Sequence, residues 1–486
     1  MGFLVFFAVV GAPMRCDALV VGSGISGSCL AHHLAKKNVQ VLLAERNDVV
    51  GGNVISKTDG TFIWEEGPNS FQPTPAIMQT AYELGIDDQL VFADPTLPPW
   101  VFFQDELYAL PKNLPGDLLN FNLLTWPGKI RAALGAVGLF LAPPPQNKAE
   151  NIEEFVSRHL GREAFERIID PFVSGVYAGD PKRLEMKAAL KKIFRLQTLS
   201  FNGALVPGAV VRFQEIAQEK RDNPPDPAWP TYKSGELGSF RRGLQTLPNA
   251  IANRLGDDRV LLGHKLVKVE RNGDDWLATF EHSKGETIIA TRALICTAPA
   301  HAVADVLADV MPQAGRLREV YYPPVASVTV AYPKTAFKNP DLPGFGSLNP
   351  RSEGVRTLGT IWSSSLFPGR APDDYNLLLN YIGGSRDVGI ADLNEDEIVG
   401  EVHKGCQRVL LKPNAPDPKV LGVRLWPRAI PQYESGHLEL LEELDAGEAA
   451  CPGLFLGGNY RTGVAFGDCV QYGVDASRRV ASYLGK

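Results

Sequence analysis

A glycine-rich turn near the start of the chain constrains the fold more than any other feature. The apolar run 17–21 is typical of a buried strand, and it leads directly into Gly22, Gly24 and Gly27. The first glycine permits a tight turn, the second lets a pyrophosphate approach the backbone, and the third packs a helix on the strand. Free N–H groups at the start of that helix would bind the phosphates. The segment therefore predicts a strand, a turn and a helix that bind a dinucleotide.

A second strand and an acid complete this motif. Residues 39–44 are apolar and end at Glu45, where a carboxylate can accept a hydrogen bond from an adenosine ribose. A lone glycine motif is weak evidence, but here strand, helix, second strand and acid follow in the expected order. Dinucleotide binding is therefore favoured over a plain structural turn.

The residues that follow select the dinucleotide. Arg46 comes directly after the acid, and Gly51-Gly52 forms a second glycine pair. The spacing Glu-Arg-x(4)-Gly-Gly resembles the extended FAD motif of the amine-oxidase and phytoene-desaturase superfamily. NAD enzymes usually lack the second pair, so we predict FAD. We expect it to be bound non-covalently, because no cysteine or histidine lies in a recognisable flavin-linkage motif.

Composition and charge narrow the function classes. The 486 residues are 44% hydrophobic and 21% charged, which suits a large enzyme with more than one domain. A net charge of −6 argues against nucleic acid as the main partner. The six cysteines lack C-x-x-C or metal-ligand spacing, which predicts free thiols in a reducing compartment. The eight histidines show no obvious cluster, so we predict structural roles for them and no metal site.

The N-terminal segment 1–14 is apolar but shorter than the roughly 20 residues that span a bilayer. It lacks a basic n-region, so a trimmed targeting remnant, a misassigned start and a disordered tail all stay open. We exclude it from the expected fold.

Several later elements have clear start or end signals. Thr74 before Pro75 predicts the start of a helix. Asn151 with Glu154 predicts a capping box for a helix that ends at Gly161. Alternating or continuous apolar patterns predict strands at 260–262, 266–270, 276–280, 292–299 and 453–456.

The C-terminal strand runs into Gly457-Gly458, and a long helical segment follows from Gly463 to Leu484. In the superfamily this strand and helix entry form the third FAD contact. The positive end of the helix dipole would favour anionic reduced flavin. We therefore expect an FAD domain built from the beginning, middle and end of the chain.

Six stretches resemble one family within this superfamily. The most specific reads Asp-Pro-Phe-x-x-Gly-x-x-x-Gly-Asp-Pro over residues 170–181. From about Asp17 to its last residue, the chain resembles the oxygen-dependent protoporphyrinogen oxidases of the plastid and cyanobacterial type. The six stretches are 67–71, 170–181, 358–364, 381–385, 430–433 and 457–460.

This resemblance implies an α/β protein with three domains. They are a Rossmann-like FAD domain of the p-cresol methylhydroxylase or amine-oxidase kind, an α+β substrate domain and a helical membrane-associating domain. The implied boundaries are 15–92, 236–301 and 440–486 for the FAD domain, 93–112 and 302–439 for the substrate domain, and 113–235 for the helical domain.

The implied activity is the six-electron oxidation of protoporphyrinogen IX to protoporphyrin IX in haem and chlorophyll biosynthesis. Electrons pass through FAD to O2 in three rounds and give hydrogen peroxide. Positioning of the flavin beside a meso carbon is then the main catalytic device, and no catalytic triad is required. The resemblance also implies a homodimer on a plastid (thylakoid or envelope) or cyanobacterial membrane surface, with ferrochelatase or magnesium chelatase as partners.

By position, Leu348, Ile361 and Tyr381 match family residues that pack on the pyrrole rings, and Gly175 matches a glycine whose carbonyl faces the porphyrinogen N–H groups. Leucine and isoleucine in strands are otherwise ordinary core residues, and Gly175 otherwise a simple turn. The residues expected to contact FAD are Gly22, Ser23, Gly24, Ile25, Ser26, Gly27, Glu45, Arg46, Gly51, Gly52, Gly67, Pro68, Asn69, Ser70, Val267, Trp426, Gly458, Asn459, Val464, Ala465 and Phe466.

One position departs from the family pattern. Many plant and animal members place an arginine for a substrate propionate where this chain has Pro99. Propionate pairing is then expected from a lysine or arginine of the helical domain, or from water.

Membrane contact is expected from the segment Leu118 to Ala142, for which a buried core helix or channel wall is the alternative. The expected apolar face consists of Ile130, Leu134, Val137 and Leu141, widened by Leu139 and Phe140 and flanked by Trp126 and Lys129.

Two other kinds of protein fit parts of this pattern. An amine oxidase or carotenoid desaturase shares the FAD motifs, although we cannot place the aromatic cage of an amine oxidase. A non-catalytic escort protein on the same fold is disfavoured, because such proteins have largely abandoned flavin and the glycine motifs here are intact.

Overall fold

The computed structural model describes residues 13–111, 116–118, 120–139, 141–146 and 148–486. Residues 1–12 of the excluded N-terminal segment therefore lie outside the described residues. Met14 was also left out of the expected fold, and that prediction was wrong. Met14 opens strand β1 (Met14–Val21) and pairs with Ile289, because the parallel ladder of the neighbouring strand reaches that far.

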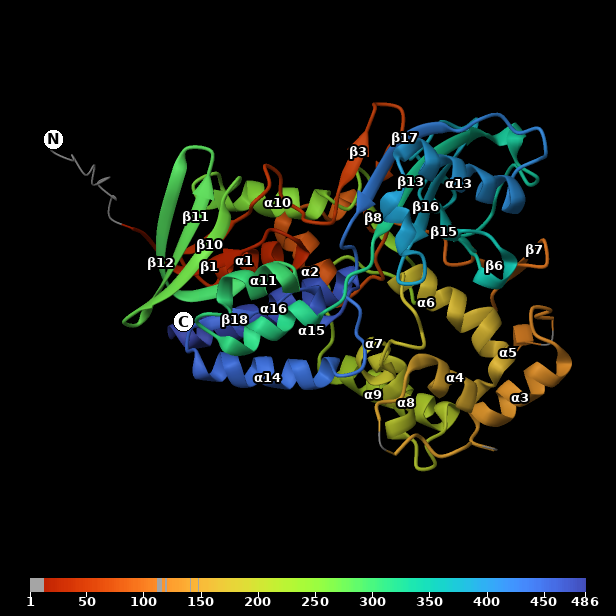
Figure 1. The fold of residues 1–486 in the computed structure, drawn as a ribbon, viewed down its shortest axis with the longest axis horizontal. Coiled ribbons are helices and arrows are strands. Elements are labelled where there is room, and N and C mark those ends of the chain that lie inside the picture. The colour runs from red at the N-terminus through yellow and green to blue at the C-terminus, as the bar shows by residue number, and fades with distance from the viewer. Residues whose placement is uncertain (1–12, 112–115, 119, 140, 147) are drawn as a thin grey trace.

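Within the described ranges, seven strands form a first sheet, at the left of Figure 1. Its central strands are parallel, and an antiparallel meander extends one side. The strands come from three distant parts of the chain, which places its beginning, middle and end in one layer. In spatial order they are β10 (Lys265–Asn272), β11 (Asp275–His282), β12 (Gly285–Cys296), β1, β2 (Val41–Ala44) and β9 (Val260–Leu261), with β18 (Leu454–Leu456) also paired to β12.

Helices cover both faces of this sheet, and each face has its own apolar core. One face is covered by α1 (Ile25–Lys36), α2 (Pro75–Leu84), α10 (Thr246–Leu255) and α16 (Phe466–Leu484). The other is covered by α11 (Ala300–Leu307) and α14 (His437–Ala450). The short helix α15 (Asn459–Thr462) lies between β18 and α16.

A second sheet, again of seven described strands, lies at the upper right of Figure 1. Helix α13 (Glu395–Val409) packs on the face that carries Ala326, Val328 and Ile382. The opposite face, which carries Ser327 and Tyr381, is covered in part by the segment 62–67. In spatial order the strands are β17 (Lys419–Trp426), β13 (Val325–Pro333), β16 (Tyr375–Gly383), β15 (Thr357–Trp362), β14 (Gly346–Leu348), β6 (Pro99–Phe103) and β7 (Glu106–Ala109).

Short ladders and a helical region complete the fold. The ladders pair β3 (Ser56–Thr58) with β4 (Ile63–Glu65) and β5 (Leu90–Phe92) with β8 (Gly238–Phe240), and α12 (Ser363–Leu366) follows β15. The helical region, below the second sheet in Figure 1, contains α3 (Trp126–Ala136), α4 (Ile152–Leu160), α5 (Arg162–Ala164), α6 (Asp170–Tyr177), α7 (Met186–Ala189), α8 (Lys191–Leu199) and α9 (Leu205–Asp222).

The local start signals are confirmed. The Asn151 side chain accepts from the Glu154 N–H, and the Glu154 carboxylate accepts in return from the Asn151 N–H, so α4 begins with the predicted capping box and ends before Gly161. Thr74 Oγ1 accepts from the Ile77 N–H and caps α2. The C-terminal helix begins at Phe466 rather than at Gly463, whose φ of +133° interrupts helical geometry.

The predicted helical face over 118–142 is wrong in part. Helix α3 ends at Ala136, and Gly138 adopts a φ of +90°, so Val137 and Leu141 lie beyond it. Lys129 is buried rather than interfacial, with its Nζ 4.6 Å from the centre of the Trp126 ring. Phe140 and the side chain of Leu118 lie outside the described residues.

Candidate active site

The first glycine turn has the shape that a pyrophosphate requires. Gly22 adopts a φ of +98°, and a Cβ at Gly27 would lie 1.9 Å from the Gly22 carbonyl oxygen, so the helix packs directly on the turn. A Cβ at Gly24, by contrast, would meet no atom within 4 Å. Gly24 is the N-cap of α1, so this open space lies at the positive end of a helix.

The second glycine pair lies against the first turn. Gly51 donates from its N–H to the Ser23 carbonyl at 3.0 Å and forms an isolated bridge with Gly24. A Cβ at Gly52 would lie 3.1 Å from the Gly24 Cα. The two glycine motifs are therefore one structure, and side chains at these positions would fill the space beside the helix terminus.

Glu45 is buried and fixes the end of β2 to this turn. One carboxylate oxygen accepts from the Ser23 N–H at 2.9 Å and hydroxyl at 2.8 Å, and the other accepts from the Asn47 N–H at 2.9 Å and amide at 2.8 Å. The predicted ribose contact would have to share these oxygens with protein donors. Arg46, the next residue, is exposed.

The third predicted FAD contact comes from the start of α16. A Cβ at Gly473 would lie 2.5 Å from the Cys29 Cβ, so α16 and α1 run in close contact. Phe466 stacks on Phe71 with ring centroids 5.3 Å apart, so its side chain belongs to the core. Gly458, with a φ of +113°, lies one loop earlier, and a Cβ there would be 3.2 Å from the Thr297 carbonyl oxygen.

The segment 65–67 connects the first sheet region to the second sheet. Three side chains of the second sheet donate to its successive carbonyl oxygens: Thr329 to Glu65 at 3.4 Å, Ser327 to Glu66 at 2.6 Å and Tyr381 to Gly67 at 2.8 Å. The Trp426 indole N–H also donates to Glu66, at 2.9 Å. The site-facing side of the second sheet therefore holds the loop that leads into Pro68, Asn69 and Ser70.

Strand register places the predicted substrate residues on one face. Gly359 of β15 pairs with Leu348 on one side and with Tyr381 on the other, and Ile361 lies two residues further along β15. Directly paired residues and residues two apart point to the same side of a sheet. Because Gly359 has no side chain, nothing at that position separates Leu348 from Tyr381. All three side chains are half-buried, whereas Leu379 and Ile382 beside them are buried.

Gly175 faces this same surface from the helical region. A Cβ at Gly175 in α6 would lie 2.5 Å from Leu348 Cδ2 and 4.0 Å from the Leu358 carbonyl oxygen. A larger residue at this position would therefore push the Leu348 side chain aside. The four predicted substrate residues come from different segments, and the fold brings Gly175, Leu348 and Tyr381 to neighbouring positions.

The remaining predicted FAD residues occupy varied environments. Val267 lies at a register shift of β10, between Leu266 and Lys268, where a bulge redirects a side chain. Ser23, Ile25, Ser26 and Asn69 are buried, Pro68, Ser70, Asn459 and Val464 are half-buried, and Ala465 is exposed.

Sequence reasoning missed several residues that hold the site together. Thr297 Oγ1 lies 3.0 Å from both the Val21 and Gly22 carbonyl oxygens and so joins the end of β12 to the first turn. Arg370 forms a buried ion pair with Glu65 at 3.2 Å. Burial raises the pKa of Glu65, and the Arg370 charge opposes that rise. No local motif marks these residues, because each partner lies far away in the chain.

A flavin dinucleotide fits the residues present. The open space at Gly24 accepts a group that any larger side chain would displace. Asn69 is 4% exposed, and its side-chain oxygen accepts from the Ser363 hydroxyl at 3.1 Å. Its amide nitrogen has no hydrogen-bond partner among the described residues, although a buried amide normally has one. This free donor follows directly on the tethered segment 65–67.

Comparisons with known proteins agree with this geometry. Residues 25–481 match the family described as flavin containing amine oxidoreductase. The chain is 45% identical to the chloroplastic protoporphyrinogen oxidase of Oryza sativa subsp. japonica, over 99% of this chain and 90% of that protein. It is 42% identical to the chloroplastic protoporphyrinogen oxidase 1 of Arabidopsis thaliana, over 98% of this chain and 90% of that protein.

More distant proteins also match over nearly the full length of the chain. The coproporphyrinogen III oxidase of Bacillus subtilis (strain 168) is 28% identical over 96% of this chain and 98% of that protein. The crystal structure of a putative protoporphyrinogen oxidase from Exiguobacterium has a TM-score of 0.76 at 20% identity, and covers 98% of this chain and all of that one. The chain belongs to the flavin containing amine oxidoreductases and, within them, to the protoporphyrinogen oxidase family. It is an enzyme, an oxidoreductase whose cofactor is FAD.

Proposed function

We propose that this chain oxidises protoporphyrinogen IX to protoporphyrin IX with O2 as acceptor. The observation that carries the proposal is the face of the second sheet where Leu348, Ile361 and Tyr381 surround the side-chain-free position Gly359. We call this face, formed by Leu348, Gly359, Ile361 and Tyr381, the substrate floor. A flat, apolar macrocycle can lie on it, and burial of its rings supplies most of the binding energy.

Tyr381 contributes to both parts of the site. Its ring lies on the substrate floor, and its hydroxyl donates to the Gly67 carbonyl of the loop beside the predicted flavin position. One side chain therefore links the position of the substrate to that of the cofactor, which suits a reaction controlled by distance and orientation. When bound, FAD accepts a hydride equivalent and passes its electrons to O2.

The opposite wall of the substrate site is Gly175 of α6. Its carbonyl is the proposed acceptor for the porphyrinogen N–H groups, and its lack of a side chain allows α6 to approach Leu348. Pro99 pairs with Gly346 at the start of β6, so Pro99 itself offers no charge to a propionate at this edge.

An aerobic assay tests the activity. Purified yellow enzyme is mixed with protoporphyrinogen IX, and porphyrin fluorescence and peroxide are read together. A primary amine and a carotenoid precursor serve as alternative substrates. We expect porphyrin and peroxide to form from the porphyrinogen. The amine and the carotenoid precursor should give no peroxide and no fluorescent product. Peroxide from the amine alone would support an amine oxidase instead.

Coproporphyrinogen III is a second candidate substrate, since the Bacillus relative is named for it. It carries four propionates rather than two, and Pro99 offers no charge to pair with the extra carboxylates. Parallel assays should therefore give a higher kcat/KM with protoporphyrinogen IX, and the reverse order would select the second candidate.

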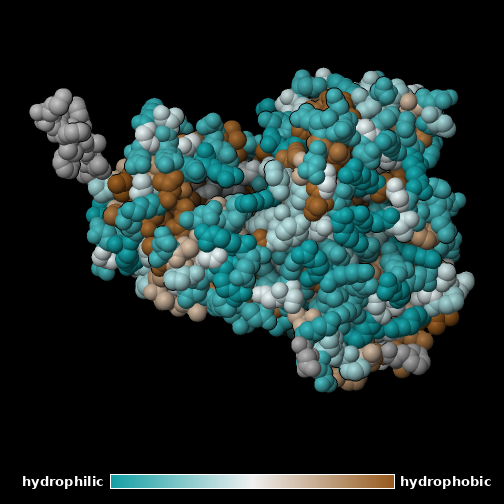
Figure 2. Space-filling model, in the orientation of Figure 1, coloured by the Kyte–Doolittle hydropathy of each residue, from teal (hydrophilic) through white to brown (hydrophobic). Residues whose placement is uncertain are grey.

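We also propose that the enzyme lies on a plastid membrane, as the chloroplastic names of its relatives suggest. Large apolar side chains are exposed on α9 and the loop before it: Phe201 is 94% and Phe213 72% exposed. Trp126, Ile130, Val137 and Leu139 add exposed apolar surface on and after α3. Figure 2 shows brown atoms at the lower right, where Figure 1 draws α3.

The two exposed segments are neighbours, which makes them one surface. The Asn202 amide contacts the Val137 carbonyl at 3.4 Å, and a Cβ at Gly203 would lie 3.7 Å from Leu141. Exposed apolar patches of this kind favour insertion into the headgroup region. Among the described residues, no helix is long and apolar enough to cross a bilayer. The homodimer and the chelatase partners stay predictions, for sedimentation and co-purification to test.

A further inference from the structure

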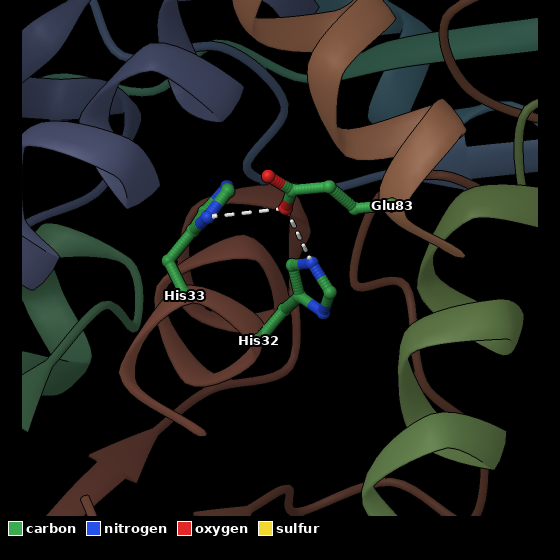
Figure 3. A group of neighbouring side chains, drawn as sticks. All are labelled: His32, His33 and Glu83. Carbon is green, nitrogen blue, oxygen red and sulfur yellow. Dashed lines mark hydrogen bonds and ion pairs between the residues drawn. The ribbon is translucent and has the colours of Figure 1, made fainter. Parts of the chain in front are cut away.

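The last turns of α1 and α2 bring three metal-competent side chains together (Figure 3). His32 and His33 project from α1 toward Glu83 of α2, and the ligand atoms of the three lie within 4.8 Å of one another. Within the part of the chain that the structure describes, this is the one such group of three. The sequence predicted no metal site, because the eight histidines show no obvious cluster along the chain.

The hydrogen bonds of Thr80 fix the tautomer of His33. The Thr80 hydroxyl donates its single hydrogen to the Ala76 carbonyl at 2.7 Å. His33 Nε2 lies 3.3 Å from the same hydroxyl oxygen, so Nε2 must be the protonated nitrogen and the donor. The Nδ1 atom of a neutral His33 then carries a lone pair, and it faces Glu83 Oε2 at 3.7 Å.

The contacts of Glu83 make this pair of atoms unusual. The Glu83 carboxylate accepts from His32 through Oε2 and is held by Gln79 and Lys36 through Oε1. The lone pair of the His33 imidazole thus faces a carboxylate oxygen without a hydrogen between them. A cation placed between the two would be stabilised by both.

We propose that His32, His33 and Glu83 form a Zn²⁺ site that clamps the end of α1 to the end of α2. Two imidazole nitrogens, one carboxylate oxygen and a water are a usual ligand set for zinc. His32 Nε2 now donates to Glu83 Oε2 at 3.1 Å, so ligation through this atom releases one proton to solvent. The bond from His33 to Thr80 is the kind of outer contact that orients a metal-binding histidine.

The affinity for the ion depends on access from solvent and on the positive charge of Lys36, which competes for Glu83. A surface cavity of about 250 Å³ reaches His33 from solvent, and the basic side chains of Lys36, Lys37 and Arg478 are part of its lining. Lys36 forms an ion pair with the other oxygen of Glu83, and its charge opposes a second cation. Removal of the Lys36 charge should therefore tighten Zn²⁺ binding, which a purely structural hydrogen-bond network does not predict.

The test is equilibrium dialysis of the FAD-loaded enzyme against Zn²⁺, with bound metal measured by mass spectrometry and thermal unfolding followed in parallel. We expect about one equivalent of saturable Zn²⁺ and a rise in Tm at saturation. Glu83→Gln and Thr80→Val should each weaken binding about ten- to a hundredfold. Lys36→Gln should strengthen it several-fold, and it changes a half-exposed side chain, so we expect the variant to fold as the parent does.

A matched control is His282→Gln. His282 stacks on His264 with ring centroids 4.6 Å apart, and this pair belongs to no group of three potential ligands among the described residues. Zn²⁺ binding should be unchanged in this variant. The proposal is overturned if Zn²⁺ does not bind saturably, if Glu83→Gln leaves the affinity unchanged, or if Lys36→Gln fails to strengthen binding.

Discussion

Tyr381 shows how a single side chain can serve two parts of a site. Its ring belongs to the floor that Leu348 and Ile361 share, and its hydroxyl holds the Gly67 carbonyl at 2.8 Å. A phenylalanine could supply the first function but not the second. The two roles can therefore be separated by substitution.

Tyr381→Phe should lower kcat/KM by about two- to tenfold, because one hydrogen bond worth about 0.5–1.5 kcal/mol is lost. Tyr381→Ala should lower it further, since ring contact is lost as well, and KM should rise. The steady-state constants are measured on flavin-loaded protein. Tyr375→Phe, in the same strand, is the control and should behave as the parent. An alanine variant with parental kcat/KM would show that the substrate does not lie on this face.

His437 is predicted to make the stability depend on pH. Burial lowers its pKa from 6.5 to about 4, and the ring stacks on Tyr433 with centroids 4.3 Å apart. The unfolded chain then binds the proton more readily than the folded one. Stability is therefore lost as the pH falls from about 6.5 toward about 4, by roughly 2 kcal/mol at about pH 5.

Thermal unfolding of the parent and of His437→Gln over this pH range measures the effect. The glutamine variant should lose less Tm on acidification than the parent. Parallel Tm curves for the two proteins would mean that His437 does not titrate in this way.

At the scale of elements, Gly24 and Gly27 of the first turn should respond differently to substitution. Gly24 faces open space, so Gly24→Val should fold with a Tm close to that of the flavin-free parent but stay colourless, because the side chain occupies the pyrophosphate position. Gly27 contacts the Gly22 carbonyl, so Gly27→Ala should lower the Tm as well as the flavin content. Flavin absorbance and Tm are read on each variant.

The control for this pair is Gly400→Val on α13, where a Cβ also meets nothing within 4 Å. It should keep its flavin. A yellow Gly24→Val protein with full occupancy would be evidence against the pyrophosphate assignment.

Elements with local signals could be predicted from the sequence, and long-range contacts could not. The capping box of Asn151 and Glu154 and the strand, turn and helix around Gly24 depend on residues close together in the chain. The prediction for the segment after Trp126 was wrong, because the apolar spacing continues past Gly138. The positive φ of Gly138 does not fit a helix, and α3 ends before it. A periodic pattern contains no information on such a break.

In the candidate site, too, local motifs could be predicted from the sequence and long-range contacts could not. Its glycine motifs were visible in the sequence, but the tether of Ser327, Thr329 and Tyr381 to segment 65–67 joins parts of the chain that only the fold brings together. The pairing of Gly359 with both Leu348 and Tyr381 depends on strand register, which a single sequence does not determine.

At the scale of the whole molecule, the exposed apolar surface of α9 should determine membrane binding. The double substitution Val210→Glu and Phe213→Glu should release the enzyme from anionic lipid vesicles while its flavin is kept, because both side chains are more than half exposed. Co-sedimentation with vesicles measures the bound fraction. Val388→Glu, at an exposed valine that is 53% accessible and lies beyond β16, is the control and should stay bound. Undiminished binding of the double variant would place the membrane contact elsewhere.

The account depends most on the claim that flavin and porphyrinogen meet between the two sheets. The most direct test is the stoichiometry of an aerobic reaction with protoporphyrinogen IX, in which porphyrin formed and peroxide released are counted together. Removal of six electrons, two to each O2, predicts about three peroxides for each porphyrin. The yellow parent should reach this ratio and the colourless Gly24→Val protein should form no porphyrin above the spontaneous rate. Equal porphyrin formation by both proteins, or porphyrin without peroxide, would contradict the account.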